Sequence, residues 1–215
     1  DLWRLRVQAA AVALLTAGGV AAFVGSVSTW RTLERTQAAY YAGHRFPDLF
    51  AEVRRAPAAL ARRLEALPGV AEVEARLGAY GSLALEAAPG HAITARLLSQ
   101  PPGGSRLDRL HLRRGRGPAG PGEAALGEGF ADAWGLGPGD ALTVVVNGRR
   151  ERLTVVGVAV SPGTVYAVRP GDLFPDDRHF ALLWVDEATL AAALDLEGAW
   201  NEVGIVLAPG ARPAE

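Results

Sequence analysis

The segment VQAAAVALLTAGGVAAFVGSVST, residues 7–29, contains no charged side chain. Its length is close to the roughly 20 residues that an α-helix needs to cross the hydrocarbon core of a bilayer. We therefore predict a transmembrane helix over residues 7–29, preceded by a short interfacial segment, residues 1–6. A cleaved signal peptide is the alternative, but its apolar core runs for only about 7–15 residues and ends in a small-residue cleavage site.

Two tryptophans, Trp3 and Trp30, bracket this segment. At about 1.5 Å per residue they lie roughly 40 Å apart along a helix, which is the thickness of a bilayer with its headgroups. We expect both to be membrane-interface anchors, as in the aromatic belts of membrane proteins. Arginines flank both ends of the segment in nearly equal number, so charge alone does not set its orientation.

Small residues recur at every fourth position of the predicted helix, at Ala13, Ala17, Ala21 and Gly25. A ridge of this kind allows another membrane helix to approach closely. An alanine-rich composition also produces such spacing by chance, so both interpretations stay open: a helix-packing ridge, or no function.

Composition limits the possible functions of the rest of the chain. The 215 residues suffice for one ordinary or split domain, and 49% hydrophobic with 21% charged residues is unlike a disordered chain. The net charge of −1 gives no basis for nucleic-acid binding. The absence of cysteine excludes disulfides, iron–sulfur clusters and thiol catalysis.

No motif for catalysis is found in this sequence. All 22 basic residues are arginine, and without lysine a Walker A phosphate-binding loop is impossible. The four histidines are scattered without metal-ligand spacing, and no G-x-S-x-G nucleophile elbow occurs. We assign no catalytic, cofactor-binding or metal-binding residue.

The sequence after residue 30 predicts an α+β fold. A polar, unbroken helical pattern continues the membrane helix as a stalk, residues 30–44. Strand–helix–strand patterns follow in residues 45–85 and again in residues 166–215, where Asp186 is the expected N-cap of the helix. We expect the two halves to form one split αβ layer with helices on one face. Its shared sheet is predicted to contain residues 48–53, 70–77, 180–185 and 201–207.

Residues 86–165 are rich in glycine and proline and are predicted to form an inserted β-rich subdomain. Asn147 and Gly148 tolerate positive φ and predict a type I′ hairpin between LTVVV and RRERLTVVGV. Charged residues beside this hairpin tip indicate that it projects into water. Five arginines between residues 106 and 116 could meet lipid phosphates or an acidic partner, although a solvated loop explains them better.

Several stretches together resemble the FtsX-like permeases of ABC transporters, with their MacB-like extracytoplasmic core domain. They are DLWRLR at the start of the membrane segment, STWRTLERTQAAYYAGHRFPDLFAEVRRAPAALARRLEALPGVAEVE, GFADAWGLGPGDALTVVVNGRRERLTVVGVAVSP, and YAVRPGDLFPDDRHFALLW. The family order of a first membrane helix, a split porter-like αβ layer, an inserted β-rich lobe and a return to the membrane is similar to the order predicted above.

The resemblance implies a cytoplasmic N-terminus in the inner (cytoplasmic) membrane, with the chain after residue 30 extracytoplasmic. It implies mechanical coupling to an ABC ATPase subunit, which would bind ATP and Mg²⁺, so that no cofactor is expected in this chain. Other implied partners are the membrane, further permease helices or a second permease half, and an extracytoplasmic protein. It implies no nucleic-acid partner, and it does not select a transported substrate.

A different class of protein remains possible from the residues: a single-pass, membrane-anchored binding or adaptor domain that works without an ATPase. A second hydrophobic stretch of about 20 residues soon after Glu215 would favour the permease, and its absence would favour the adaptor. We also expect the next membrane helix of a permease to lie in that direction.

Overall fold

The computed structural model of this chain describes residues 6–85, 90–164 and 168–211. The chain divides into two compact units, Asp1–Gly43 and His44–Glu215, which are described separately below. We call the described part of the second unit, residues 44–211, the body.

The first unit is a single helix, α1 (Arg6–Gly43, 38 residues). Residues 6–37 form one candidate membrane span with a mean hydropathy of 2.0, and none of its most apolar window is buried inside the chain. The hydroxyls of Thr16 and Ser26 donate to the carbonyl oxygens of Val12 and Ala22, four residues earlier. These polar side chains are therefore satisfied within the helix, as an apolar environment requires.

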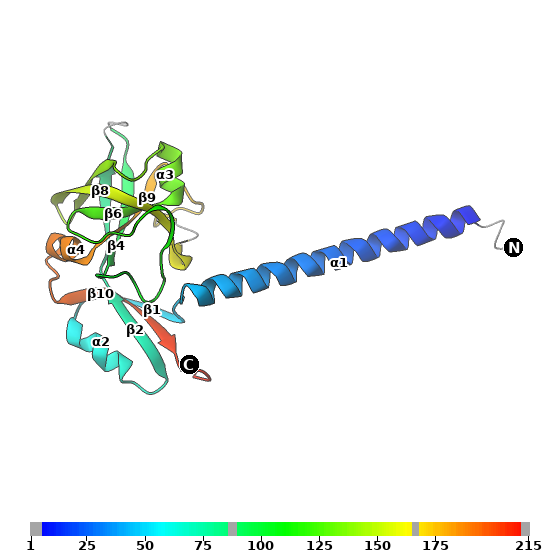
Figure 1. The fold of residues 1–215 in the computed structure, drawn as a ribbon, viewed down its shortest axis with the longest axis horizontal. Helices are drawn as coiled ribbons and strands as arrows, with labels where there is room; N and C mark the ends of the chain where they lie inside the picture. Colours follow the sequence, from blue (N-terminus) through cyan, green and yellow to red (C-terminus); the bar gives the residue numbers. More distant parts are fainter. Residues whose placement is uncertain (1–5, 86–89, 165–167, 212–215) are drawn as a thin grey trace. The chain divides into compact units, whose positions relative to one another are not determined.

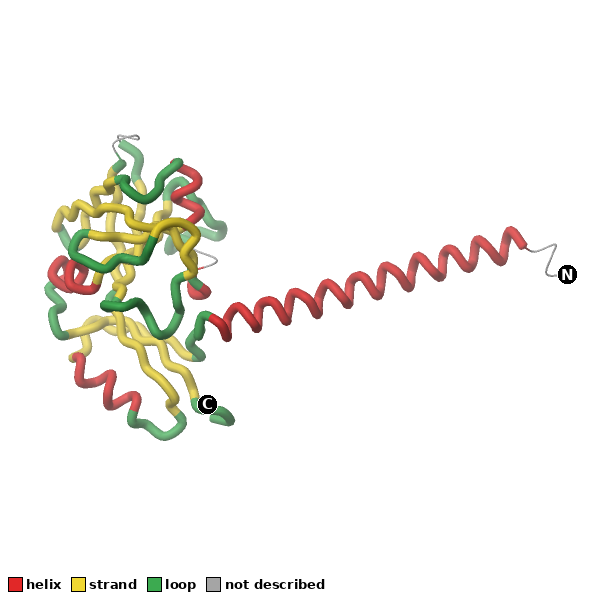
Figure 2. The backbone as a smooth tube through the Cα atoms, in the orientation of Figure 1, coloured by secondary structure: helices red, strands yellow, loops and turns green. Residues whose placement is uncertain are grey.

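The body contains four short helical segments and ten strands among its described residues (Figures 1 and 2). The strands are β1 (Leu49–Pro57), β2 (Val70–Arg76), β3 (Gly78–Ala84), β4 (Ile93–Gln100), β5 (His111–Gly115), β6 (Glu123–Gly127), β7 (Ala141–Val146), β8 (Arg149–Val160), β9 (Phe180–Asp186) and β10 (Ala199–Leu207). The helices are α2 (Ala58–Glu65), α3 (Glu128–Trp134), the 3₁₀ turn η1 (Pro162–Thr164) and α4 (Glu187–Leu194).

The smaller sheet has the order β1-β10-β2, and both of its pairings are antiparallel. Its buried side chains include Val73, Trp200 and Val203, and Leu60 and Leu64 of α2 pack against them. The apolar face of α2 therefore covers one side of this sheet, as the leucine spacing in the sequence indicates.

The larger sheet has the order β5-β8-β6-β9-β4-β3-β7, with an additional pairing of β7 with β8. The sequence of neighbours β8-β6-β9-β4-β3-β7 thus returns to β8, and the sheet closes on itself. Closure removes the unpaired edges that an open sheet would present. The main hydrophobic core belongs to this sheet and includes Leu97, Leu126, Val144, Leu153 and Leu183.

One predicted sheet is wrong. Residues 180–185 were expected beside the early strands, but β9 lies in the larger sheet, parallel to β4 and antiparallel to β6. Only β1, β2 and β10 share the smaller sheet. All seven residues of β9 are buried, which suits a strand covered on both faces and explains its place in the middle of the larger sheet.

The chain passes from the smaller sheet to the larger one through a single residue, Leu77, which lies between β2 and β3 and is buried. The amide of Leu77 donates to Ser99 Oγ at 2.8 Å. The next residue, Gly78, exchanges two hydrogen bonds with the side-chain amide of Asn201 on β10, at 2.8 and 2.7 Å. The two sheets are therefore held at a short, fully hydrogen-bonded crossover.

Candidate functional site

The residues proposed as membrane anchors and as a packing ridge lie at the start of the chain. Trp30 is on α1 and is 71% exposed, whereas Trp3 falls outside the described residues. Ala13, Ala17, Ala21 and Gly25 are all exposed on α1, and an added Cβ at Gly25 would meet no atom within 4 Å. The ridge is exposed among the described residues of α1, and its role stays a prediction.

The hairpin between β7 and β8 turns at Asn147 (φ 50°) and Gly148 (φ 74°), with Val146 paired to Arg149. These angles are those of a type I′ turn. The tip is exposed, but it does not project freely into water. Asn147 Nδ2 donates to the carbonyl oxygen of Ala193, and Arg149 donates to that of Ala192 at 2.8 Å. These donors satisfy carbonyl groups at the C-terminus of α4.

The basic run between residues 106 and 116 is largely compensated by carboxylates that lie outside the run. Four of the five arginines pair with carboxylates: Arg106–Glu72 at 3.6 Å, Arg113–Glu128 at 3.1 Å, Arg114–Asp132 at 2.8 Å and Arg116–Glu123 at 2.6 Å. The hydrogen bond from Arg116 lowers the pKa of Glu123 to about 2. This pairing supports the solvated loop over a free cationic surface.

The segment that follows α1 in the sequence is hydrogen-bonded to another loop of the body. The amide of Asp108 donates to the carbonyl oxygen of Arg45 at 3.1 Å, and the amide of Arg109 donates to that of His44 at 3.0 Å. The guanidinium of Arg45 also pairs with Glu72 on β2. We call residues 44–45 and 108–109 the junction.

Asp108 connects the junction to the interior. Its carboxylate side chain is only 3% exposed and accepts from Arg76 Nη1 at 3.1 Å and from the amide of Gly163 at 2.8 Å. The buried hydroxyl of Ser161 lies 3.4 Å from the same carboxylate. One buried side chain therefore links β2 to the segment that follows β8.

A second buried carboxylate, Glu202 on β10, bridges the two sheets. It accepts from Arg76 Nε at 3.1 Å and also pairs with Arg96, which lies on β4 of the larger sheet. The guanidinium of Arg96 stacks over the ring of Tyr80 at 4.6 Å. In this ionic group each buried carboxylate thus has an arginine partner, which is the condition for keeping such groups inside a fold.

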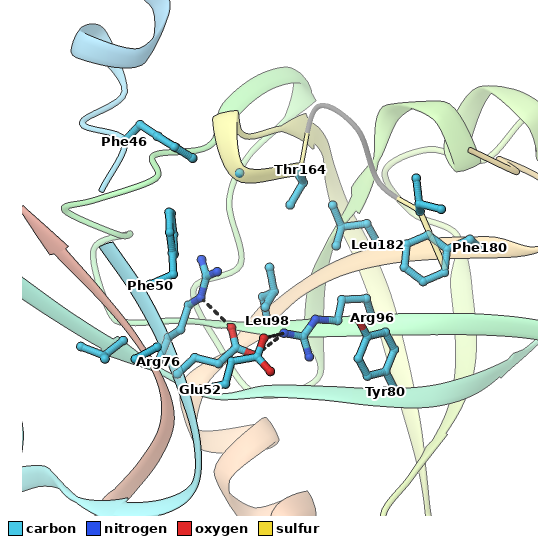
Figure 3. Close-up of a pocket in the computed structure, with 15 residues that line it drawn as sticks. Phe46, Phe50, Glu52, Arg76, Tyr80, Arg96, Leu98, Thr164, Phe180 and Leu182 are labelled. Carbon is cyan, nitrogen blue, oxygen red and sulfur yellow. Dashed lines mark hydrogen bonds and ion pairs between the residues drawn. The ribbon is translucent and has the colours of Figure 1, made fainter. Parts of the chain in front are cut away.

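A cavity of about 330 Å³ opens above this ionic group. Figure 3 shows Phe46 and Phe50 on one side of it, Leu182 and Phe180 on the other, and the charged side chains at its base. Both sheets contribute to its wall, because Glu202 belongs to the smaller sheet and Arg96 to the larger one. The cavity, the Glu202 group and the junction together form the candidate functional site.

No residue of this site was predicted to be functional from the sequence, and Arg109 was noted only as part of the basic run. A signal for two of them is visible in the sequence: Arg96 and Glu202 are the single charges of two otherwise uncharged strands, ITARLLSQ and AWNEVGIVL. Charges in such positions are costly unless they are paired. The partner of each charge lies more than a hundred residues away, and no local pattern identifies it.

Two histidines lie near each other at a different place in the body. The rings of His91 and His179 are 6.4 Å apart, and His179 Nδ1 is 2.8 Å from Asp176 Oδ2. This hydrogen bond lowers the pKa of Asp176. Within residues 6–85, 90–164 and 168–211, no three histidine, aspartate or glutamate side chains are grouped to hold a metal ion.

Comparisons with known proteins identify the family. The extracellular domain of the ABC-type transporter YknZ from Gram-positive bacteria shares 14% identity, with a TM-score of 0.49 over 73% of this chain and 75% of that one. The periplasmic region of MacB from Actinobacillus actinomycetemcomitans shares 13% identity, with a TM-score of 0.44 over 73% and 66% of the two chains. No curated protein sequence matches. The sequence profile of the MacB-like periplasmic core domain matches residues 9–215, and the chain therefore belongs to the MacB-like periplasmic core domain family.

Proposed function

We propose that this chain forms the first membrane helix and the extracytoplasmic core of the permease subunit of an ABC transporter. In this proposal α1 spans the inner membrane with its N-terminus in the cytoplasm. ATP and Mg²⁺ act on a separate ATPase subunit, and the body responds to the movement of membrane helices. Membership of the family and the apolar helix support the proposal.

The length of α1 suits a helix that both spans and extends. Its 38 residues make a rod of about 57 Å at 1.5 Å per residue, whereas the hydrocarbon core is about 30 Å thick. The remainder would continue beyond the bilayer without a break. A continuous helix transmits an axial or rotational displacement better than a flexible linker does.

The junction is the observation that carries the proposal. A displacement of Arg45 acts directly on Asp108 through a backbone hydrogen bond. The buried carboxylate of Asp108 passes that displacement to Arg76, and Arg76 is tied in turn to Glu202. Through these contacts the segment after the membrane helix is linked to Glu202, which bridges both sheets of the body through Arg96.

The start of the first body strand, β1, and the end of the last one, β10, lie close together, which also suits a permease. The amide of Leu207, the last residue of β10, donates to Asp48 Oδ2 at 2.8 Å, and the amide of Asp48 donates to Ile205 at 2.9 Å. The chain therefore enters the body and leaves its last strand at neighbouring positions. A chain that continued after β10 could return to the membrane beside the point where it left.

Coupling is tested in the full-length permease reconstituted with its ATPase in nanodiscs. Three glycines inserted after Gly43 should leave ATP hydrolysis intact but abolish the nucleotide-dependent change in hydrogen exchange expected at residues 106–109. The matched control places the same insertion after Gly171, in an exposed loop, and should keep the change. If the insertion after Gly43 also keeps it, the junction does not transmit the movement.

Topology is tested with single cysteines, since the chain has none of its own. Arg150→Cys, an exposed position beside the hairpin tip, should react with an impermeant maleimide on intact cells, and Leu2→Cys should be protected. The reverse pattern contradicts the orientation. If no ATPase associates with the full-length protein and no second hydrophobic stretch follows, the adaptor function holds instead.

A further inference from the structure

The cavity above Glu202 has the size and lining of a small-molecule site. Its volume of about 330 Å³ falls within the range of about 300–1,000 Å³ that is typical of ligand pockets. Such pockets combine mostly apolar walls with a few polar groups that orient the ligand. The geometry points to a binding site for a small molecule with an apolar, aromatic or aliphatic body and a cationic amine head. This inference goes beyond the proposed function and does not depend on it.

The walls supply the apolar part of the site. Leu98, Phe180 and Leu182 come from β4 and β9 of the larger sheet, and each is less than 10% exposed. Phe50, on β1 of the smaller sheet, is half exposed, and its ring lies 5.2 Å from that of Phe46. Aromatic rings on both sides and the leucine side chains between them would enclose an apolar ligand body and remove it from water.

The charged side chains at the base of the cavity indicate which charge the head group of the ligand would carry. Two guanidinium groups, those of Arg76 and Arg96, face three carboxylates. Glu202 and the nearby Asp108 are buried and closely paired with these arginines, whereas Glu52 is 79% exposed and its ion pair with Arg96 is 3.8 Å long. The surplus negative charge therefore lies on Glu52, which also lines the cavity.

An ammonium group fits this arrangement better than a carboxylate does. It would meet the loosely paired carboxylate of Glu52, and the neighbouring ring of Phe50 offers a cation–π contact. An anionic head would be repelled by Glu52 and would find both arginines already neutralised. Tyr80 also lines the cavity, but its ring is already covered by the guanidinium of Arg96.

The test uses three probes that share one body and differ only in the head: 4-phenylbutylamine, 4-phenylbutanol and 4-phenylbutyrate. They are titrated by calorimetry into the full chain in nanodiscs. Thr164→Trp, which adds bulk at a half-buried position lining the cavity, should abolish binding, and empty nanodiscs measure how each probe partitions into lipid. Ala71→Trp adds the same bulk at an exposed position of β2 outside the cavity and should leave binding unchanged.

The expected order of affinity is amine, then alcohol, then carboxylate, with about a tenfold range between the first and the last. Glu52→Gln should weaken amine binding by about three- to fivefold, the effect of losing one exposed ion pair, and should leave the alcohol unaffected. Phe50→Ala, which removes a half-exposed ring and leaves the core intact, should weaken all three probes. The inference is overturned if the carboxylate binds as tightly as the amine, or if wild type and Thr164→Trp give the same titration.

Discussion

Arg45 and Asp108 are joined by a backbone hydrogen bond of 3.1 Å, and both have a left-handed backbone, with φ values of 53° and 48°. Non-glycine residues rarely adopt this conformation, which persists only where the surrounding structure fixes it. Here it is fixed from both sides, because Arg45 pairs with Glu72 and Asp108 with Arg76. Two constrained residues thus face each other in the segment that follows α1 in the sequence and the loop bonded to it.

The first prediction concerns the charge on Asp108. Asp108→Asn keeps the shape of the side chain but leaves Arg76 without one of its two buried partners. We expect the free energy of unfolding of the body to fall by about 2–3 kcal/mol, because a buried hydrogen bond to a charged group is lost. Equilibrium urea unfolding followed by tryptophan fluorescence measures the change.

The matched control is Asp132→Asn, which removes a carboxylate that pairs with Arg114 at the surface, where both side chains are at least half exposed. Surface ion pairs contribute at most about 1 kcal/mol. Equal losses for the two variants would contradict the role assigned to Asp108.

The second prediction concerns Gly78, where the chain enters the larger sheet. A Cβ there would lie 1.6 Å from Glu202 Oε1, so that Gly78→Ala must displace the carboxylate that holds Arg76 and Arg96. We expect a loss of about 2–3 kcal/mol in unfolding free energy, in the range of overpacked interiors. Gly117→Ala, where an added Cβ meets nothing within 4 Å, serves as the control.

A double variant separates the collision from a general effect on the backbone. Combined with Glu202→Ala, the alanine at position 78 has no carboxylate to meet. The cost of Gly78→Ala should therefore be smaller in that background, so that the two losses do not add. Additive losses would show that Gly78 is needed for another reason.

The elements of the fold could be predicted from local sequence more readily than their arrangement. The long apolar helix α1 follows from an uncharged apolar run, the Asn147 turn from residues that accept positive φ, and the cap at Asp186 from a side chain that accepts from the amide of Thr189. Each of these depends on residues close together in the chain. The position of β9 depends on which distant strand it pairs with, and the repeated strand–helix–strand pattern led to the wrong sheet.

The run FALLWV did carry information about that position. It has no polar alternation, which is typical of a strand buried on both faces, whereas an outer strand such as β1 mixes charged and apolar residues. The candidate site was even harder to predict from the sequence. Glu202 and Arg96 are 106 residues apart, and only the folded structure brings them together.

The third prediction concerns the pH dependence of Glu123. Its pKa is lowered to about 2 by hydrogen bonds from Arg116 and from the amide of Ala119. A carboxyl group with a lowered pKa in the folded state contributes stability above its unfolded pKa, and this contribution is lost as the pH falls towards the folded value. The contribution of Glu123 should therefore persist at neutral pH and disappear between about pH 4.5 and 2.

NMR titration of the Glu123 carboxyl carbon measures this pKa directly. Arg116→Gln should move the titration midpoint upward, towards that of an ordinary glutamate. Arg150→Gln removes an exposed arginine at the hairpin and should leave the midpoint unchanged. A midpoint that does not respond to Arg116→Gln would show that the ion pair does not form in solution.

The fourth prediction concerns the small-residue ridge of α1. In the proposed permease this ridge packs against another membrane helix, and association in lipid depends on close van der Waals contact, which small residues permit. Ala17→Leu or Ala21→Leu should therefore lower the amount of full-length permease that assembles with its ATPase, by about tenfold where the contact is tight. Ala22→Leu is the matched control, because at 3.6 residues per turn Ala22 lies about 140° around the helix from Ala17. All three substitutions keep the segment apolar, so membrane insertion should be equal. Co-purification with the ATPase in mild detergent would be compared at equal membrane content. If Ala22→Leu weakens assembly as much as Ala17→Leu does, the recurrence of small residues at every fourth position reflects only the alanine-rich composition of the helix, and the packing face lies elsewhere.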